Sequence, residues 1–285
     1  MQPSIKTIDY KSKNASSEFT NSLHHTGFAI LRNHPLDVNL ITSVYEEWGV
    51  FFNNDEKHTH AFHPENQDGY FPFRCENAKG YSEKDLKEFY HVYKWGRYPN
   101  SISDKTKLIF HELMIIGKQL LSWIDKHSPD DVKSNYSIPL SEMIENSRMN
   151  LLRIIHYPPL EPNDFEGALR AGAHGDINLI TILPAGSQPG LQVQTKKGEW
   201  LEVQCNPGWL IINTGDMLNE CSNKYFPSTI HRVINPMGAD AKLPRYTMPF
   251  FIHPRDEVIL SDRYTSRSFL DERLNEIGLK KDPGK

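Results

Sequence analysis

Residues 171–178 read Ala-Gly-Ala-His-Gly-Asp-Ile-Asn and lead into the apolar run 179–183. The imidazole of His174 stands two residues before the carboxylate of Asp176. On a β-strand, side chains at positions i and i+2 leave the same face, so we expect both groups to reach one ion. The best candidate for a third ligand is His231, in Ser-Thr-Ile-His-Arg-Val. Two histidines and one carboxylate on one side of a metal leave its other positions open, a facial arrangement that suits Fe(II).

Short apolar runs surround and follow this stretch. They begin near residue 148, are rich in Ile, Val, Leu and Thr, and are separated by Pro, Gly and Asn. Several strands at such short spacing are typical of a sandwich or barrel of the jelly-roll type. The predicted strands are 150–156, 178–183, 191–194, 200–203, 209–213, 231–234 and 246–252.

The residues before 148 are mainly helical. Apolar side chains recur there at three- and four-residue spacing, with Asp37 as a helix N-cap and Gly27 as a helix end. The predicted helices are 16–25, 37–53, 104–127 and, after the strands, 261–277; strands are expected at 5–9, 28–32 and 89–93, and an irregular region at 54–80. The fold class is therefore mainly β with flanking helices (α+β).

Composition excludes several classes of protein. The net charge of −4 gives no basic surface for nucleic acid, and no apolar run approaches the roughly 20 residues that span a membrane. Three cysteines without a CxxC pair predict neither a disulfide framework nor a zinc ribbon. With no apolar leader at the N-terminus, we expect a cytoplasmic protein, a monomer or weak homo-oligomer, that binds neither nucleic acid nor membrane.

A second pair of polar side chains follows the proposed metal ligands. Arg245 and Thr247 open the apolar strand that ends near residue 252, and on a strand they share one face. A guanidinium beside a hydroxyl can clamp a carboxylate, because the arginine fork gives charge-assisted bonds and the threonine adds a donor. This pair meets the requirement for binding the distal carboxylate of 2-oxoglutarate inside an apolar core.

In this order, the motifs resemble those of the isopenicillin N synthase-like family of Fe(II)/2-oxoglutarate-dependent dioxygenases. The resemblance covers most of the chain. It rests on the segments 26–34, 51–57, 85–92 and 152–159, the HxD pair, the Gly190-Leu-Gln-Val strand, the turn 213–216, His231-Arg-Val, and the RxS/T pair at Arg245 and Thr247.

The resemblance implies a double-stranded β-helix (jelly-roll) core and a full set of cofactors. Fe(II) would bind His174, Asp176 and His231, and O2 would be the oxidant. The distal carboxylate of 2-oxoglutarate would bind Arg245 and Thr247. Tyr157 would donate a further hydrogen bond to that carboxylate. The asparagine that the family usually carries two residues earlier is Ile155 here.

We expect four segments that pack as one unit. Residues 1–100 resemble the family's N-terminal domain, 101–147 form the long helix and a connection, 148–255 form the Fe(II)/2-oxoglutarate jelly roll, and 256–285 form a C-terminal helix and tail. Residues 128–150 do not have the composition of a flexible linker.

The expected activity is hydroxylation of a small molecule, an amino acid or small acid, with release of succinate and CO2. Arg74, Arg148, Asn150 and Phe251 are candidates for the substrate site, because each lies near a motif and an arginine could bind a substrate carboxylate. Two alternatives remain open. One is an oxidase of the isopenicillin N synthase type that uses Fe(II) and O2 without 2-oxoglutarate, and the other is an inactive barrel that binds a ligand or a protein.

Overall fold

The strands form two sheets. The computed structural model describes all residues except 1–4, 64, 77–82, 162–163, 165–167 and 277–285. The larger sheet has the order β1-β2-β10-β7-β13-β5-β4-β3, with β12 also paired to β5; the smaller has the order β6-β11-β8-β9. The strands are β1 (Thr7–Asp9), β2 (Phe28–Arg32), β3 (Gly69–Phe71), β4 (Glu88–Val92), β5 (Leu151–Tyr157), β6 (Ala171–His174), β7 (Ile180–Pro184), β8 (Leu191–Gln194), β9 (Trp200–Glu202), β10 (Leu210–Thr214), β11 (His231–Val233), β12 (Arg245–Thr247) and β13 (Phe250–Ile252). Such a pair of sheets confirms the predicted jelly-roll core. Between the described strands, hydrogen bonds do not close the two sheets into a barrel.

The larger sheet is buried on both faces, so the residues of each strand divide between two cores. In β5, Leu152 and Ile154 belong to the core on the helix side, and Ile155 and Tyr157 belong to the core between the two sheets. This division follows from the two-residue period of a strand. We call these regions the outer layer and the inner layer. The inner layer holds the candidate site.

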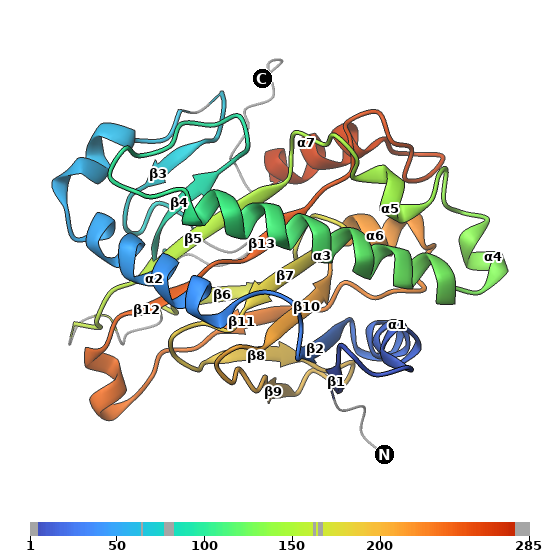
Figure 1. Ribbon diagram of the computed structural model, residues 1–285, viewed down its shortest axis with the longest axis horizontal. Coiled ribbons are helices and arrows are strands. Elements are labelled where there is room, and N and C mark those ends of the chain that lie inside the picture. Colours follow the sequence, from blue (N-terminus) through green and yellow to red (C-terminus); the bar gives the residue numbers. More distant parts are fainter. Residues whose placement is uncertain (1–4, 64, 77–82, 162–163, 165–167, 277–285) are drawn as a thin grey trace.

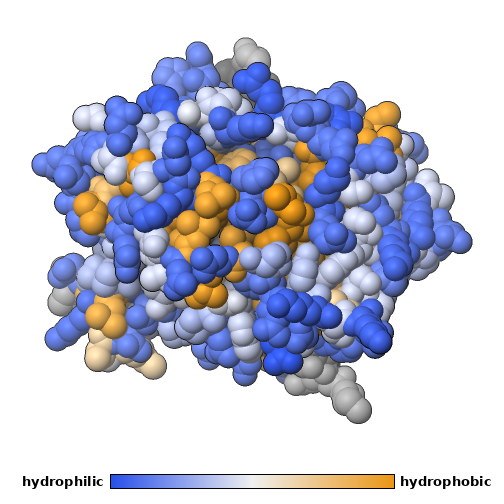
Figure 2. Space-filling model, viewed as in Figure 1, coloured by the Kyte–Doolittle hydropathy of each residue, from blue (hydrophilic) through white to orange (hydrophobic). Residues whose placement is uncertain are grey.

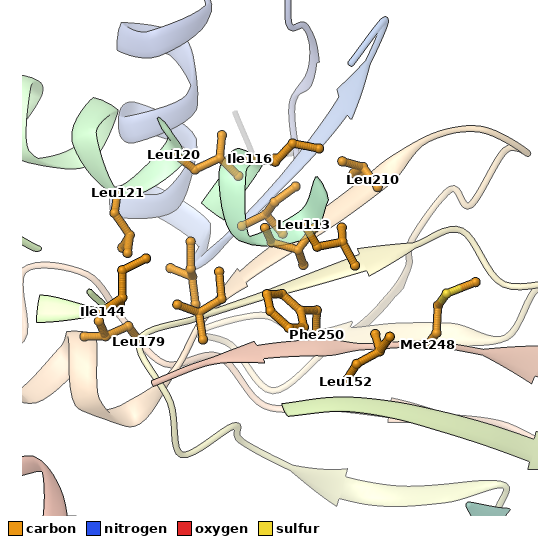
Figure 3. Packing of buried hydrophobic residues seen from close by; sticks show 14 of the residues in the cluster. Leu113, Ile116, Leu120, Leu121, Ile144, Leu152, Leu179, Leu210, Met248 and Phe250 are labelled. Carbon is orange, nitrogen blue, oxygen red and sulfur yellow. The ribbon is translucent and has the colours of Figure 1, made fainter. Parts of the chain in front are cut away.

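Helices cover the outer face of the larger sheet, and α3 lies across its strands (Figure 1). The helices are α1 (Ala15–Thr26), α2 (Val38–Phe52), α3 (Lys105–His127), α4 (Asp130–Lys133), α5 (Leu140–Met143), α6 (Asp216–Cys221) and α7 (Ser266–Glu276), with 3-10 turns at Asp55–His60 and Gly238–Lys242. The apolar stripe predicted for α3 is buried, and Figure 3 shows Leu113 beside Phe250 of the sheet. Gly117 allows this close approach, because a Cβ there would stand 2.1 Å from the end of Ile252.

The ends of the early helices follow the sequence signals. Gly27 closes α1 with a left-handed φ of 70°, and its N–H donates to the Leu23 carbonyl. The Asp37 side chain caps α2 by accepting from the Asn39 N–H. Both predicted signals are therefore confirmed.

The structure corrects three of the predicted elements. The strand expected to run through 246–252 is broken into β12 and β13, because Pro249 has no N–H to donate to a neighbouring strand. The region 54–80, expected to be irregular, contains a 3-10 turn and β3. The last helix begins at Ser266 rather than 261, because a bridge between Ile259 and Thr265 turns the chain first.

The face that carries α3 is mostly hydrophilic. Hydrophobic side chains show in its middle, and hydrophilic ones surround them (Figure 2). Leu108 and Ile115 are exposed residues of α3. None of the described helices has the length and apolar character needed to cross a bilayer.

Candidate active site

The structure brings His174, Asp176 and His231 together. His174 is the last residue of β6 and His231 is the first of β11, and these two residues pair across the sheet. One ligand atom from each of the three side chains lies within 4.8 Å of the others. The Asp176 Oδ1 atom is 3.9 Å from the Nε2 of His174 and 3.8 Å from the Nε2 of His231. The arrangement can hold one metal ion.

Each of the three side chains turns one polar atom toward the other two, and its second polar atom makes a hydrogen bond that fixes the side chain in place. The Nδ1 of His174 bonds to the Gly172 carbonyl at 2.7 Å, and the Nδ1 of His231 bonds to the Thr229 carbonyl at 3.2 Å. An Nδ1–H donated in this way leaves Nε2 as a metal ligand. The Oδ2 of Asp176 accepts from Thr181 and Asn213, which leaves Oδ1 free to bind a metal.

Asp176 does not lie on a strand, contrary to the expectation that it shares a strand face with His174. Strand β6 ends at His174, and Asp176 belongs to the turn that follows. Its carbonyl accepts from the Asp216 N–H at 2.7 Å, so the turn 213–216 fixes the backbone of Asp176. Gly215 is required there, because a Cβ would stand 2.1 Å from the Asn178 carbonyl oxygen. Sequence reasoning named this turn but missed the role of Asn213.

The electrostatics of the cluster set its protonation. Burial, and then the neighbouring His231, lower the pKa of His174 to about 4. Burial acts to raise the pKa of Asp176, but His231 and His174 outweigh it and hold that pKa below its usual value. At neutral pH the imidazole of His174 is therefore neutral and the carboxylate is ionised. These are the forms that bind a metal.

Arg245 and Thr247 leave the same face of β12 and are buried, with exposed fractions of 1% and 3%. The Arg245 Nε donates to the Gln188 carbonyl at 3.0 Å. Among the described residues, neither Arg245 Nη1 nor Thr247 Oγ1 has a hydrogen-bond partner. The nearby Tyr45 hydroxyl is turned to the carbonyls of residues 184 and 185, at 3.4 Å each. A buried guanidinium with unpaired donors fits a ligand carboxylate, because leaving such donors unpaired is costly.

The ring of Tyr157 in the inner layer is approached by two buried arginines. The guanidinium carbon of Arg245 is 5.1 Å from the centre of its ring, and that of Arg170 is 5.9 Å away. Tyr157 and Arg245 also pair directly between β5 and β12. Sequence reasoning missed Arg170, although it stands only four residues before His174. A charged residue in a short run gives no sign of which way its side chain points.

A group of buried and partly buried polar side chains, which we call the charged wall, lies beside the metal cluster. It consists of Glu76, Asp85, Lys87, His91 and Arg153. Lys87 Nζ is 2.8 Å from Asp85 and 3.1 Å from Glu76, and Arg153 contacts Glu76 at 3.3 Å and His91 at 2.8 Å. The wall is tied to β6, because the Asp85 carboxylate accepts from the Gly172 N–H at 2.9 Å. Sequence reasoning missed these residues.

The four substrate candidates fall into two groups. Asn150 accepts from the His253 N–H at 2.9 Å, and Phe251 pairs with Thr181, which bonds to Asp176. These two therefore lie near the metal cluster. Arg74 is half-exposed and paired with Asp164, and Arg148 stacks on Trp95 at 5.6 Å. Surface hollows of about 580 and 220 Å³ are not lined by any of the three candidate metal ligands, although Thr229 and Ile230, just before His231, line the smaller one.

Two family profiles match the chain. The profile of the 2OG-Fe(II) oxygenase superfamily matches residues 148–254. A second, described as the N-terminal part of a non-haem dioxygenase in morphine synthesis, matches residues 5–109. All three residues of the metal cluster and the Arg245–Thr247 pair lie inside the first match.

Solved structures and a curated relative agree with these profiles. A putative oxygenase from Shewanella oneidensis is 48% identical, with a TM-score of 0.88, covering 98% of this chain and 100% of the other. A putative 2OG-Fe(II) oxygenase family protein from Caulobacter crescentus is 30% identical, with a TM-score of 0.77, covering 96% and 99%. A 2-oxoglutarate-Fe(II) type oxidoreductase from Aspergillus fumigatus is 36% identical over 122 residues, which are 42% of this chain and 34% of that protein. The match to this last relative thus spans about a third of its length.

Proposed function

The chain belongs to the 2OG-Fe(II) oxygenase superfamily, and from this premise we propose that it hydroxylates a small molecule, an amino acid or small acid, releasing succinate and CO2. Fe(II), 2-oxoglutarate and O2 are its metal, co-substrate and oxidant. The family predicted from the order of the motifs is thereby confirmed. When bound, Fe(II) and 2-oxoglutarate together reduce O2, so that one oxygen atom enters a C–H bond of the substrate and the other enters succinate.

We propose His174, Asp176 and His231 as the Fe(II) ligands. Their free atoms converge, and each side chain is oriented by a hydrogen bond from its other polar atom. Neutral imidazole and carboxylate are ligands that suit Fe(II), and three ligands on one side leave room for the co-substrate and O2. The turn 213–216 then acts by holding Asp176 in place.

We propose that Arg245 and Thr247 bind the distal carboxylate of 2-oxoglutarate, with Tyr157 beside them. The observation that carries this assignment is the pair of buried, unpartnered polar atoms, Arg245 Nη1 and Thr247 Oγ1, on one strand face. An oxidase that did without 2-oxoglutarate would use these groups for a carboxylate of its own substrate, and a requirement of turnover for 2-oxoglutarate distinguishes the two enzymes. The departure from the family at Ile155 places an apolar side chain in the same inner layer.

The charged wall is our proposal for the substrate side of the site. Burial opposes ionisation of Glu76, but Arg153 and Lys87 outweigh it and hold the pKa of that carboxyl far below its usual value. The wall carries two cations and two anions that pair with one another, and such a polar lining suits a small zwitterion or acid better than a hydrocarbon. Arg153 stacks on Phe251 at 5.5 Å, and we propose that it binds the substrate carboxylate.

The test is succinate release from 2-oxoglutarate by purified protein with Fe(II), ascorbate and O2, with and without a library of amino acids and small acids. The proposal expects turnover that requires 2-oxoglutarate and rises with one class of substrate. Arg153→Gln should raise KM for that substrate by ~10- to 100-fold, because a charge-assisted bond is lost. Arg263→Gln, an exposed surface change, is the control. Absence of succinate from the wild-type protein would contradict the proposal.

A further inference from the structure

Arg170 is a fully buried arginine whose charge has no counter-ion among the described residues. Its exposed fraction is 0%, and its Nε and Nη1 atoms have no hydrogen-bond partner. Its Nη2 donates to the Leu243 carbonyl at 3.0 Å, and its backbone N–H donates to the Asn235 side chain at 2.9 Å. The residue is therefore held firmly in place while two of its donor nitrogens remain unpaired.

The surroundings of Arg170 add a second cation instead of an anion. Arg170 and Arg245 approach the same Tyr157 ring, at 5.9 and 5.1 Å. Burial, and then the charge of Arg245, lower the pKa of Arg170 to about 10. Removing an ion from water without a partner costs several kcal/mol. Two buried cations that approach one ring, neither paired with an anion among the described residues, call for an external anion to balance them.

The acidic residues of the neighbouring charged wall do not provide this balance. Glu76 and Asp85 are paired with Lys87, and Glu76 also with Arg153. The wall is neutral as a group, with two cations and two anions. The unbalanced positive charge is thus confined to the end of the inner layer where Arg170 and Arg245 lie.

We propose that Arg170 is a second cation of the co-substrate pocket, and that Arg170 and Arg245 together bind the distal carboxylate of 2-oxoglutarate. This inference rests on the function proposed above. Two guanidinium groups make the pocket selective for an oxo acid with a second carboxylate over one that ends in a methyl group. They also mean that the protein without co-substrate carries a repulsion between two buried cations, which binding relieves.

The test is calorimetric titration of anaerobic Fe(II)-loaded protein with 2-oxoglutarate and, separately, with 2-oxobutyrate, which lacks the distal carboxylate. Arg170→Met should weaken 2-oxoglutarate binding by ~10- to 100-fold, the loss of a charge-assisted pair. It should leave 2-oxobutyrate binding within about twofold, since that ligand has no group for Arg170 to bind. Arg263→Gln should change neither affinity.

A second measurement separates this role from a structural one. The melting temperature of the metal-free, co-substrate-free protein should stay equal or rise in Arg170→Met, because an unbalanced buried charge is removed. If Arg170→Met does not fold, Arg170→Lys keeps the charge but loses the fork, and it should still lower 2-oxoglutarate affinity selectively.

Equal losses for the two oxo acids, or unchanged 2-oxoglutarate affinity in a folded Arg170→Met protein, would overturn the inference while leaving the proposed function intact. A wild-type Fe(II) protein that binds no 2-oxoglutarate would instead overturn the proposed function.

Discussion

Buried charge is treated differently on the two faces of the larger sheet. In the outer layer Glu88 is fully paired, because its carboxylate accepts from Tyr70, Lys57 and His156. In the inner layer the charged wall is paired within itself, but Arg170 and Arg245 each keep unpaired donors. A buried charge with unpaired donors points to a bound ligand, because leaving those donors unpaired is costly. The outer layer therefore stabilises the fold, and the inner layer contains the candidate active site.

The largest effect should come from removing the inner-layer carboxylate. Asp176→Ala should abolish succinate formation and weaken Fe(II) binding by more than ~100-fold, since loss of a ligand exceeds loss of a supporting hydrogen bond. Metal titration and turnover measure this, and circular dichroism checks that the fold is intact. Unchanged Fe(II) affinity in a folded variant would show that the metal lies elsewhere.

A matched change in the outer layer should affect only stability. Leu113→Ala removes a fully buried side chain of α3 and should lower the free energy of unfolding by about 3 kcal/mol. Urea unfolding measures the loss. Turnover per folded molecule should stay within about twofold, because no described polar group of the site contacts this side chain. A large loss of turnover at full folding would break the distinction between the layers.

Removing the hydrogen bond that orients Asp176 should have an intermediate effect on Fe(II) affinity. Asn213→Ala deletes a 2.7 Å hydrogen bond to Asp176 and should lower Fe(II) affinity by ~10- to 100-fold. Asn135→Ala, which removes an exposed amide bonded to the Asp131 carbonyl, serves as the control. Equal Fe(II) affinities in the two variants would mean that Asn213 does not orient the ligand.

The smallest effect concerns a buried histidine next to the site. Burial lowers the pKa of His253 to about 4, so below pH 6.5 the unfolded chain takes up a proton that the folded chain does not. Stability is therefore fully present above pH 6.5 and declines as the pH falls toward 4. In metal-free protein, His253→Asn should reduce this slope by up to about 1.4 kcal/mol per pH unit in urea unfolding at pH 4.5 to 7. Identical slopes would contradict a buried neutral His253.

The outer layer could be predicted well from the sequence, because its signals are periodic. The stripe of α3 and the caps at Gly27 and Asp37 depend on local spacing alone. The convergence of His174, Asp176 and His231 could also be predicted, since HxD before one strand and His before another is a specific pattern. The chemistry of that cluster could be inferred from residue types.

The inner layer could be predicted only in part, for a physical reason. Strands buried on both faces lose the alternation of polar and apolar residues that reveals direction. Nothing local shows that Lys87 and Arg170 point inward, or that Arg74 and Arg148 lie at the surface. Their places depend on partners more than 50 residues away, such as the pairing of β4 with β5.

One calorimetric comparison tests most directly whether the metal and the co-substrate carboxylate bind to separate groups of residues. Wild-type protein and Arg245→Met are titrated anaerobically, first with Fe(II) and then with 2-oxoglutarate. We predict Fe(II) affinities equal within about twofold and a loss of 2-oxoglutarate affinity of ~100-fold or more, because Arg245 binds the co-substrate and not the metal. Unchanged 2-oxoglutarate affinity in Arg245→Met would contradict the account.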